Sequence, residues 1–131
     1  MKESHESLRK NGMMAHLMDA LDAKKDIGHY GRLVFAMVAR HFLEEDELIG
    51  YLRKDPDVTE EQARALYVQV QGKDYSPPRR ERILQWQREQ EFHICPDPEN
   101  PDSCNVYKDL KFPPEVYEHI SGYYEQKAEQ S

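Results

Sequence analysis

The chain has 131 residues, of which 38% are hydrophobic and 33% charged, and its formal net charge is -7. This length predicts one domain with a single core, spanning residues 1–131 with frayed ends at 1–8 and 125–131. The negative charge argues against unaided, non-specific binding of duplex nucleic acid, because such binding depends on neutralising phosphates. No apolar run approaches the roughly 20 residues that cross a bilayer, and the first residues lack the apolar centre of a signal peptide. We therefore expect a cytoplasmic protein that makes no contact with a membrane.

The hydrophobic pattern predicts an all-α fold, a compact bundle of about five to six helices. The first helix precedes the polar residues 22–28 and has one apolar face, formed by Met14, Leu17, Met18 and Leu21. The second helix is apolar on all sides over 33–39, as expected of a central helix enclosed by its neighbours. A short third helix over 48–52 ends before Pro56, because proline disfavours helical geometry in the residue before it.

The helical pattern continues in the second half of the chain. Thr59 and Gln62 fit a capping box at the start of a fourth helix, which ends near Gly72. A further helix is predicted over 79–92, after two prolines, and we expect its Trp86 in the core.

The C-terminal third combines a proline-rich loop over 95–104 with a last helix. Pro114 suits the first turn of this helix, because a proline there has no N–H group to leave unsatisfied. Four residues are expected on its buried face, namely Val116, Tyr117, Ile120 and Tyr124.

The two cysteines, Cys95 and Cys104, are too few for a disulfide framework. We interpret them as thiols, or as two ligands of a metal site that lacks others. With His93 they could supply three ligands to zinc, but the pattern lacks the C-x-x-C pairs that are typical of zinc sites. A plain loop is the favoured interpretation, and no cofactor is expected.

The sequence offers no catalytic centre. No serine lies in a nucleophile elbow, and no glycine-rich loop has the Walker pattern. The acidic residues 44–47 are consecutive, so on a helix they point in different directions and do not all face one metal ion. By itself, the chain is therefore not expected to be an enzyme.

Charge is distributed unevenly along the chain. Residues 73–88 hold five basic and two acidic side chains, whereas residues 89–131 hold ten acidic and three basic ones. The negative total comes mostly from the C-terminal third. A positive surface elsewhere is compatible with it, because fields at short range follow local charge.

The segment "DIGHYGRLVF", residues 26–35, begins the central helix with polar residues that core packing does not require. His29 and Arg32 lie three residues apart and share one face at the helix start, beside backbone N–H groups with partial positive charge. Arginine offers a planar, bidentate donor set for phosphate oxygens, so this pair is a candidate phosphate site. In the structural alternative, the histidine bonds a neighbouring loop and the arginine pairs with Asp26 or Asp57.

Three segments, in this order, carry a family resemblance: "HYGRL" at 29–33, "LIGYLRKDPDVTEEQARALYVQV" at 48–70 and "GKDYSPPRRERI" at 72–83. The chain from about Met13 to about Cys104 resembles the C-terminal domain of the large subunit of archaeal and eukaryotic DNA primase. In that family, a histidine and an arginine at the head of a core helix contact the triphosphate of the primer or initiating nucleotide. By resemblance, these residues match His29 and Arg32, and a tyrosine close to the same nucleic acid matches Tyr75.

The resemblance also has departures. The family domain holds an iron–sulfur cluster on four cysteines. The first two of these positions hold Met13 and Arg80 here, and neither side chain replaces a thiolate. Cys95 and Cys104 lie where the later cysteines are expected, and two thiolates do not hold a cluster. The resemblance therefore implies a version without a cluster, as is known for a divergent accessory primase subunit in some archaea.

The resemblance thus implies a non-catalytic nucleic-acid and nucleotide-binding module of a primase-type complex. Its expected partners are a catalytic subunit, a single-stranded DNA template and a primer 5′-triphosphate. The nucleotide candidates are His29, Arg32 and Tyr75, and the nucleic-acid candidates are Lys73, Arg79, Arg80 and Arg82. The alternative is a helical adaptor or structural subunit that binds a protein partner and not nucleic acid, which the charge of -7 favours. Convergence of the candidates on one open surface would favour the module, and scatter or pairing with acids would favour the adaptor.

Overall fold

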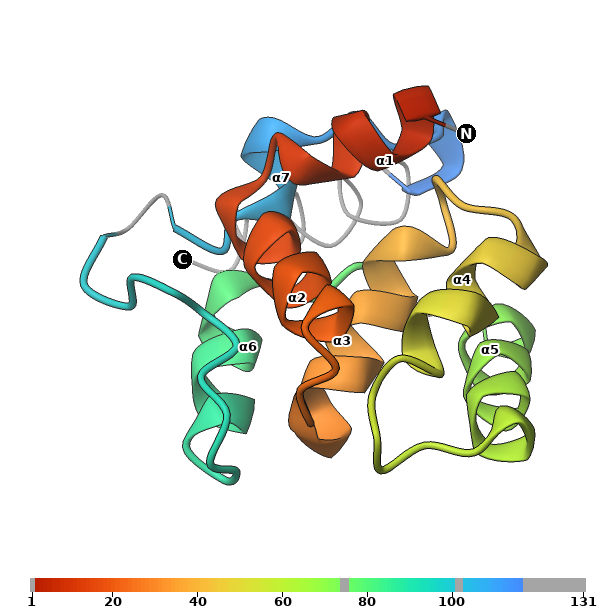
Figure 1. Ribbon diagram of the computed structural model, residues 1–131. Coiled ribbons are helices and arrows are strands. Elements are labelled where there is room, and N and C mark those ends of the chain that lie inside the picture. Colours follow the sequence, from red (N-terminus) through yellow and green to blue (C-terminus); the bar gives the residue numbers. More distant parts are fainter. Residues whose placement is uncertain (1, 74–75, 101–102, 117–131) are drawn as a thin grey trace.

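The computed structural model describes residues 2–73, 76–100 and 103–116. These residues form helices and loops without a strand, so the all-α prediction is confirmed (Figure 1). The helices are α1 (Lys2–Arg9), α2 (Gly12–Asp22), α3 (Gly28–Ala39), α4 (Glu45–Leu52), α5 (Glu60–Gly72), α6 (Arg80–Gln87) and α7 (Val106–Asp109). Residues 114–116 are also helical. Among the described residues, no helix is long and apolar enough to span a membrane.

The central helix is α3, as its apolar sequence predicts. It contacts α2, α4, α5 and α6. In Figure 1 it lies between α6 on one side and the α4–α5 pair on the other. Residues 34–39 of α3 are all buried, and Phe35 is among the largest side chains that are fully enclosed. Burial of this apolar surface supplies much of the stabilisation of the core.

Side chains at the starts of α2 and α5 satisfy backbone N–H groups that the helices leave without a partner. At the start of α2, the side chain of Asn11 accepts a hydrogen bond from the backbone N–H of Met14, 3.0 Å away. At the start of α5, the N–H of Gln62 donates to the Thr59 hydroxyl, and the N–H of Thr59 donates to the Gln62 side chain. The capping box expected at Thr59 is therefore confirmed.

The N-terminal residues differ from the frayed end that was expected. They form α1, which packs against α2 and buries Leu8 completely. His5 Nε2 lies 3.0 Å from the Glu47 carboxylate on α4, and Arg9 donates to Asp19 on α2. A single buried leucine gives no periodic apolar stripe, so the pattern of the sequence does not reveal this helix.

The helix that contains Trp86 is shorter than predicted, because α6 ends at Gln87. The following residues turn back toward the start of α3, where the side chain of Gln90 accepts a hydrogen bond from the Tyr30 N–H at 2.9 Å. The same side chain donates to the Ile27 carbonyl, also at 2.9 Å. Trp86 packs against the core with part of its surface exposed.

Of the last helix that the sequence predicts, the structure describes residues 114–116. Val116 is buried, as predicted. The other residues expected on that face, Tyr117, Ile120 and Tyr124, lie outside the described residues, as do residues 125–131. The short α7 was not expected, because its four residues are too few for a periodic pattern.

The interpretation of Cys95 and Cys104 as thiols is wrong, because the two residues form a disulfide. Their Cα atoms lie 5.6 Å apart, within the range that a disulfide spans. Both cysteines are buried, and Cys104 adopts a left-handed backbone conformation with φ of 70°. The proline-rich loop thus turns back on itself and brings its two ends together, a result of loop geometry that the count of cysteines does not reveal.

Candidate functional site

His29 and Arg32 line one pocket, of about 290 Å³, beside the start of α3. The end of α4, the turn after it and one face of α5 form the other walls. These walls comprise Leu52, Asp57, Val58, Gln62, Ala63, Ala65, Leu66 and Gln69. The two residues that spacing singles out therefore lie at the same pocket.

Acidic residues hold the guanidinium of Arg32. Its Nη1 donates to Asp55 Oδ2 at 3.0 Å and to Asp26 Oδ1 at 3.1 Å. Its Nη2 lies 3.9 Å from Asp57 Oδ2. The side chain of Arg32 is 14% exposed and that of Asp55 is 0% exposed. The pairing with Asp26 and Asp57 that the structural alternative expects is thus present, and Asp55 is added to it.

Sequence reasoning missed Asp55. Besides Arg32, its carboxylate accepts hydrogen bonds from the backbone N–H groups of Ile27, at 3.0 Å, and Asp57, at 2.8 Å. It therefore joins the segment before α3 to the turn between α4 and α5. The available signal was the Asp-Pro pair in "KDPDV", because aspartate in a turn commonly bonds the N–H group two residues later.

Side chains of this chain also cap the first turn of α3. The N–H of Gly28 donates to Asp26 at 2.8 Å, and the N–H of Tyr30 donates to Gln90. Gly28 has a positive φ of 79°, and a side chain at this position would collide with Gln90. The space that this glycine opens is therefore filled by Gln90. Any affinity for phosphate at the pocket then depends mainly on side chains and less on the backbone of the helix.

His29 is exposed, and its ring meets that of Tyr30 edge-to-face at 5.2 Å. In the part of the chain that the structure describes, it makes no hydrogen bond. The bond to a neighbouring loop that the structural alternative expects is therefore not seen there. Tyr30 stacks on Trp86 with ring centroids 5.6 Å apart. The Glu89 carboxylate raises the pKa of Tyr30, first through hydrogen bonding to the neutral hydroxyl and then through its negative charge.

The other basic candidates do not line the pocket. Lys73 is exposed directly after α5, and Arg79 is half-buried directly before α6. Arg80 donates to the carbonyl of Pro98. The exposed Arg82 has its guanidinium carbon 5.9 Å from the ring centroid of Trp86. Tyr75 lies outside the described residues. The structure thus brings together two of the seven candidates.

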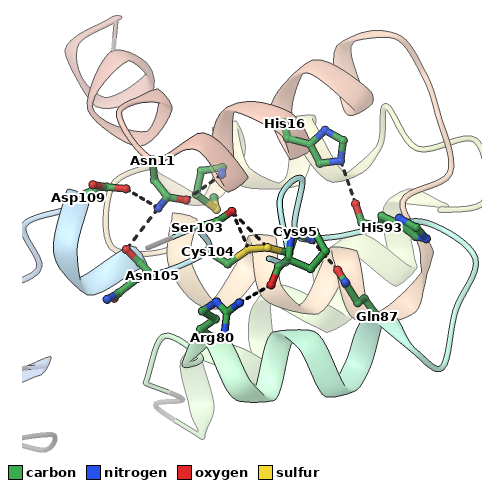
Figure 2. The surroundings of a disulfide bond; sticks show 12 residues. Asn11, His16, Arg80, Gln87, His93, Cys95, Ser103, Cys104, Asn105 and Asp109 are labelled. Atoms are coloured by element: carbon green, nitrogen blue, oxygen red, sulfur yellow. Dashed lines mark hydrogen bonds between the residues drawn. A yellow bond between two sulfur atoms is a disulfide. The ribbon is translucent and has the colours of Figure 1, made fainter. Parts of the chain in front are cut away.

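The disulfide lies in a network of polar contacts (Figure 2). The Cys95 N–H donates to Gln87 at 2.8 Å, and the Ser103 hydroxyl lies 3.3 Å from the Cys95 sulfur. In Figure 2, Arg80 reaches toward the loop beside the two sulfurs. The disulfide uses both sulfurs, so Cys95 and Cys104 do not act with His93 as metal ligands in this state. Among the described residues, no three side chains of histidine, cysteine, aspartate or glutamate gather where they could hold a metal ion.

Comparisons of the chain with protein-family models, with curated proteins and with solved structures find no match. The pocket therefore has to be interpreted from its own residues.

Proposed function

We propose that this chain is a non-catalytic nucleotide-binding module of a primase-type complex, which holds the 5′-triphosphate end of a primer or initiating nucleotide. The observation that carries the proposal is the convergence of His29 and Arg32 on one pocket. The resemblance to the primase family assigns triphosphate contact to the same two residues.

Arg32 retains donors for a ligand. A guanidinium has five N–H groups, and the two on Nη1 suffice for the bonds to Asp26 and Asp55. Among the described residues, Nε makes no hydrogen bond, and Nη2 has only its 3.9 Å ion pair with Asp57. Because Asp55 fixes one edge of the guanidinium, the other donors are oriented before a ligand arrives, which reduces the entropy lost on binding.

The role of the module is to position substrates. A separate catalytic subunit supplies the metal-binding carboxylates, and this chain holds the triphosphate so that the second nucleotide reacts within a preorganised complex. In this proposal Lys73, Arg79, Arg80 and Arg82 contact the template strand, and Tyr75 acts with His29 and Arg32 on the nucleotide. The complex acts in the cytoplasm, and the isolated chain is expected to polymerise no nucleotides.

A helical adaptor that binds a protein partner is the second candidate. Two observations favour it: the basic candidates Lys73, Arg79, Arg80 and Arg82 do not line the pocket, and the one positive charge of Arg32 faces Asp26, Asp55 and Asp57. Three carboxylates oppose the approach of a polyanion. Binding to a triphosphate therefore requires that direct contacts to His29 and Arg32 outweigh this repulsion.

Fluorescence anisotropy at fixed salt tests the proposal with two primer–templates that differ only in a 5′-triphosphate or a 5′-hydroxyl end. The full chain is expected to prefer the triphosphate. His29→Ala should reduce that preference by about tenfold, because a hydrogen bond to a charged group is worth roughly 1.5–3 kcal/mol. His29 is exposed, so this variant should fold normally.

The matched control is His93→Ala, since His93 is also exposed and does not line the pocket. Equal binding of both primer–templates by the full chain would refute the triphosphate role and leave the adaptor as the better account.

A further inference from the structure

The pocket is small and its walls are largely apolar. Leu52, Val58, Ala63 and Leu66 form much of the lining. Its volume of about 290 Å³ lies at the lower limit of ligand pockets, which span roughly 300–1,000 Å³. One planar ring system fits such a space, whereas a complete nucleoside triphosphate exceeds it. The ligand therefore enters only in part.

Charge decides which part enters. Asp57 lines the pocket, and Asp26 and Asp55 already hold the guanidinium of Arg32. A triphosphate inside would exchange its water for apolar walls and a carboxylate, which is unfavourable. An uncharged ring loses much less on leaving water and gains contact with the leucines. The phosphates are better placed at the edge of the pocket, beside His29, which lines it but is exposed to solvent.

Gln69 gives the pocket a polar group that can form hydrogen bonds with the edge of a bound ring. Along α5, Gln62, Leu66 and Gln69 share one face and all line the pocket. The side-chain oxygen of Gln62 already accepts the N–H of Thr59, so only its amide donors remain for a ligand. The carboxamide of Gln69 makes no hydrogen bond among the described residues, and it is exposed. A free carboxamide presents both donors and an acceptor, the pattern that complements the edge of a nucleobase.

From this arrangement we propose that the pocket binds the nucleobase of the nucleotide and that Gln69 recognises its edge, with the phosphates held at the edge of the pocket by His29 and Arg32. The inference rests on the proposed function and names the part of the ligand that the pocket selects. Gln69 is then the residue that sets the preference among bases.

Isothermal titration of the full chain tests the inference with three kinds of probe: the four ribonucleoside triphosphates, inorganic tripolyphosphate and the matching nucleosides. At least one nucleoside triphosphate should bind about tenfold or more tightly than tripolyphosphate, because only the former has a base to bury. Gln69→Leu should weaken that nucleotide by about threefold to tenfold, reduce differences among the bases and leave tripolyphosphate unchanged.

Gln85→Leu is the matched control, since Gln85 is an exposed glutamine on α6 that does not line the pocket. The melting temperature of both variants should equal that of the parent chain. If tripolyphosphate binds as tightly as the nucleotides and Gln69→Leu changes nothing, the nucleobase inference fails while the triphosphate role stands. If neither nucleotides nor tripolyphosphate bind, the nucleobase inference and the proposed function both fail. A side chain of a protein partner then becomes the better candidate for this pocket.

Discussion

Two irregular regions of the molecule are fixed in opposite ways. Beside the pocket, the buried carboxylate of Asp55 gathers Ile27, Arg32 and Asp57 through hydrogen bonds and charge. In the C-terminal third of the chain, a covalent bond between Cys95 and Cys104 closes the proline-rich loop. The disulfide constrains the chain whatever the side chains around it do. The Asp55 cluster depends on every partner, and it also leaves donors of Arg32 for a ligand. The region held by hydrogen bonds and ion pairs is therefore the one for which a ligand-binding role is proposed.

The largest effect is expected from Asp55→Ala. The change removes three hydrogen bonds and leaves the largely buried Arg32 without its closest buried partner. Breaking a buried ion pair on one side costs about 3–5 kcal/mol of the free energy of unfolding, which urea denaturation measures. Asp57→Ala, in the same turn but exposed, should cost far less. Equal losses for the two variants would show that the cluster is not the support described above.

The disulfide should contribute less than the cluster. Its two cysteines are separated by nine positions, and a covalent loop of this size stabilises a protein by about 2–3 kcal/mol, chiefly by restricting the unfolded chain. The double variant Cys95→Ser, Cys104→Ser should lose this amount in urea denaturation. A dithiol reductant should destabilise the parent chain by the same amount and leave the double variant unchanged. A destabilisation of the double variant by reductant would contradict this account.

The cap of α5 should have a smaller effect, although it adjoins the pocket. Thr59→Ala removes the oxygen that accepts the Gln62 N–H, and losing such a cap costs about 1 kcal/mol. Thr59→Ser keeps the hydroxyl and serves as the control. Thermal unfolding should place the serine variant near the parent and the alanine variant below it. If both variants melted together, the cap would contribute nothing measurable.

The smallest expected effect is a change of stability with pH. The stability contributed by a carboxylate contact depends on pH, whereas that contributed by a disulfide does not. The backbone N–H of Glu44 bonds the Glu47 carboxylate and lowers the pKa of Glu47, and His5 lowers it further. A carboxyl whose pKa is lower in the folded state stabilises the protein above its unfolded pKa, and this contribution is lost as the pH falls through the folded pKa. Glu47→Gln should therefore destabilise the chain at neutral pH, and this loss should shrink at a pH well below the ordinary glutamate pKa of about 4.3.

Urea denaturation at both pH values measures this difference. Glu61→Gln, which removes an exposed glutamate in the first turn of α5, is the control for the loss of one surface carboxylate. A loss for Glu47→Gln that is the same at both pH values would contradict the assigned cause.

Features whose partners are close in the sequence could be predicted. Thr59 and Gln62 are three residues apart, and the apolar run of α3 is continuous, so local pattern located both helices. The Asp55 cluster could not be predicted, because Ile27 and Arg32 lie 28 and 23 positions away from it. The end of α6 was misjudged for the same reason, since Gln90 contacts a carbonyl 63 positions earlier. In the site, the sequence predicts His29 and Arg32 as candidates. It does not identify Gln69, because the structure alone shows which face of α5 lines the pocket.

The contact between Gln90 and the start of α3 has a consequence for local opening. The Tyr30 amide hydrogen is shielded only while the segment after α6 stays docked, because its acceptor is a side chain of that segment and not a carbonyl of α3. Detachment of residues 88–92 would expose this amide to exchange with solvent without unfolding the helix. Tyr30 lies in the first turn of α3, next to His29. Hydrogen exchange at its amide therefore measures how often residues 88–92 detach from this turn.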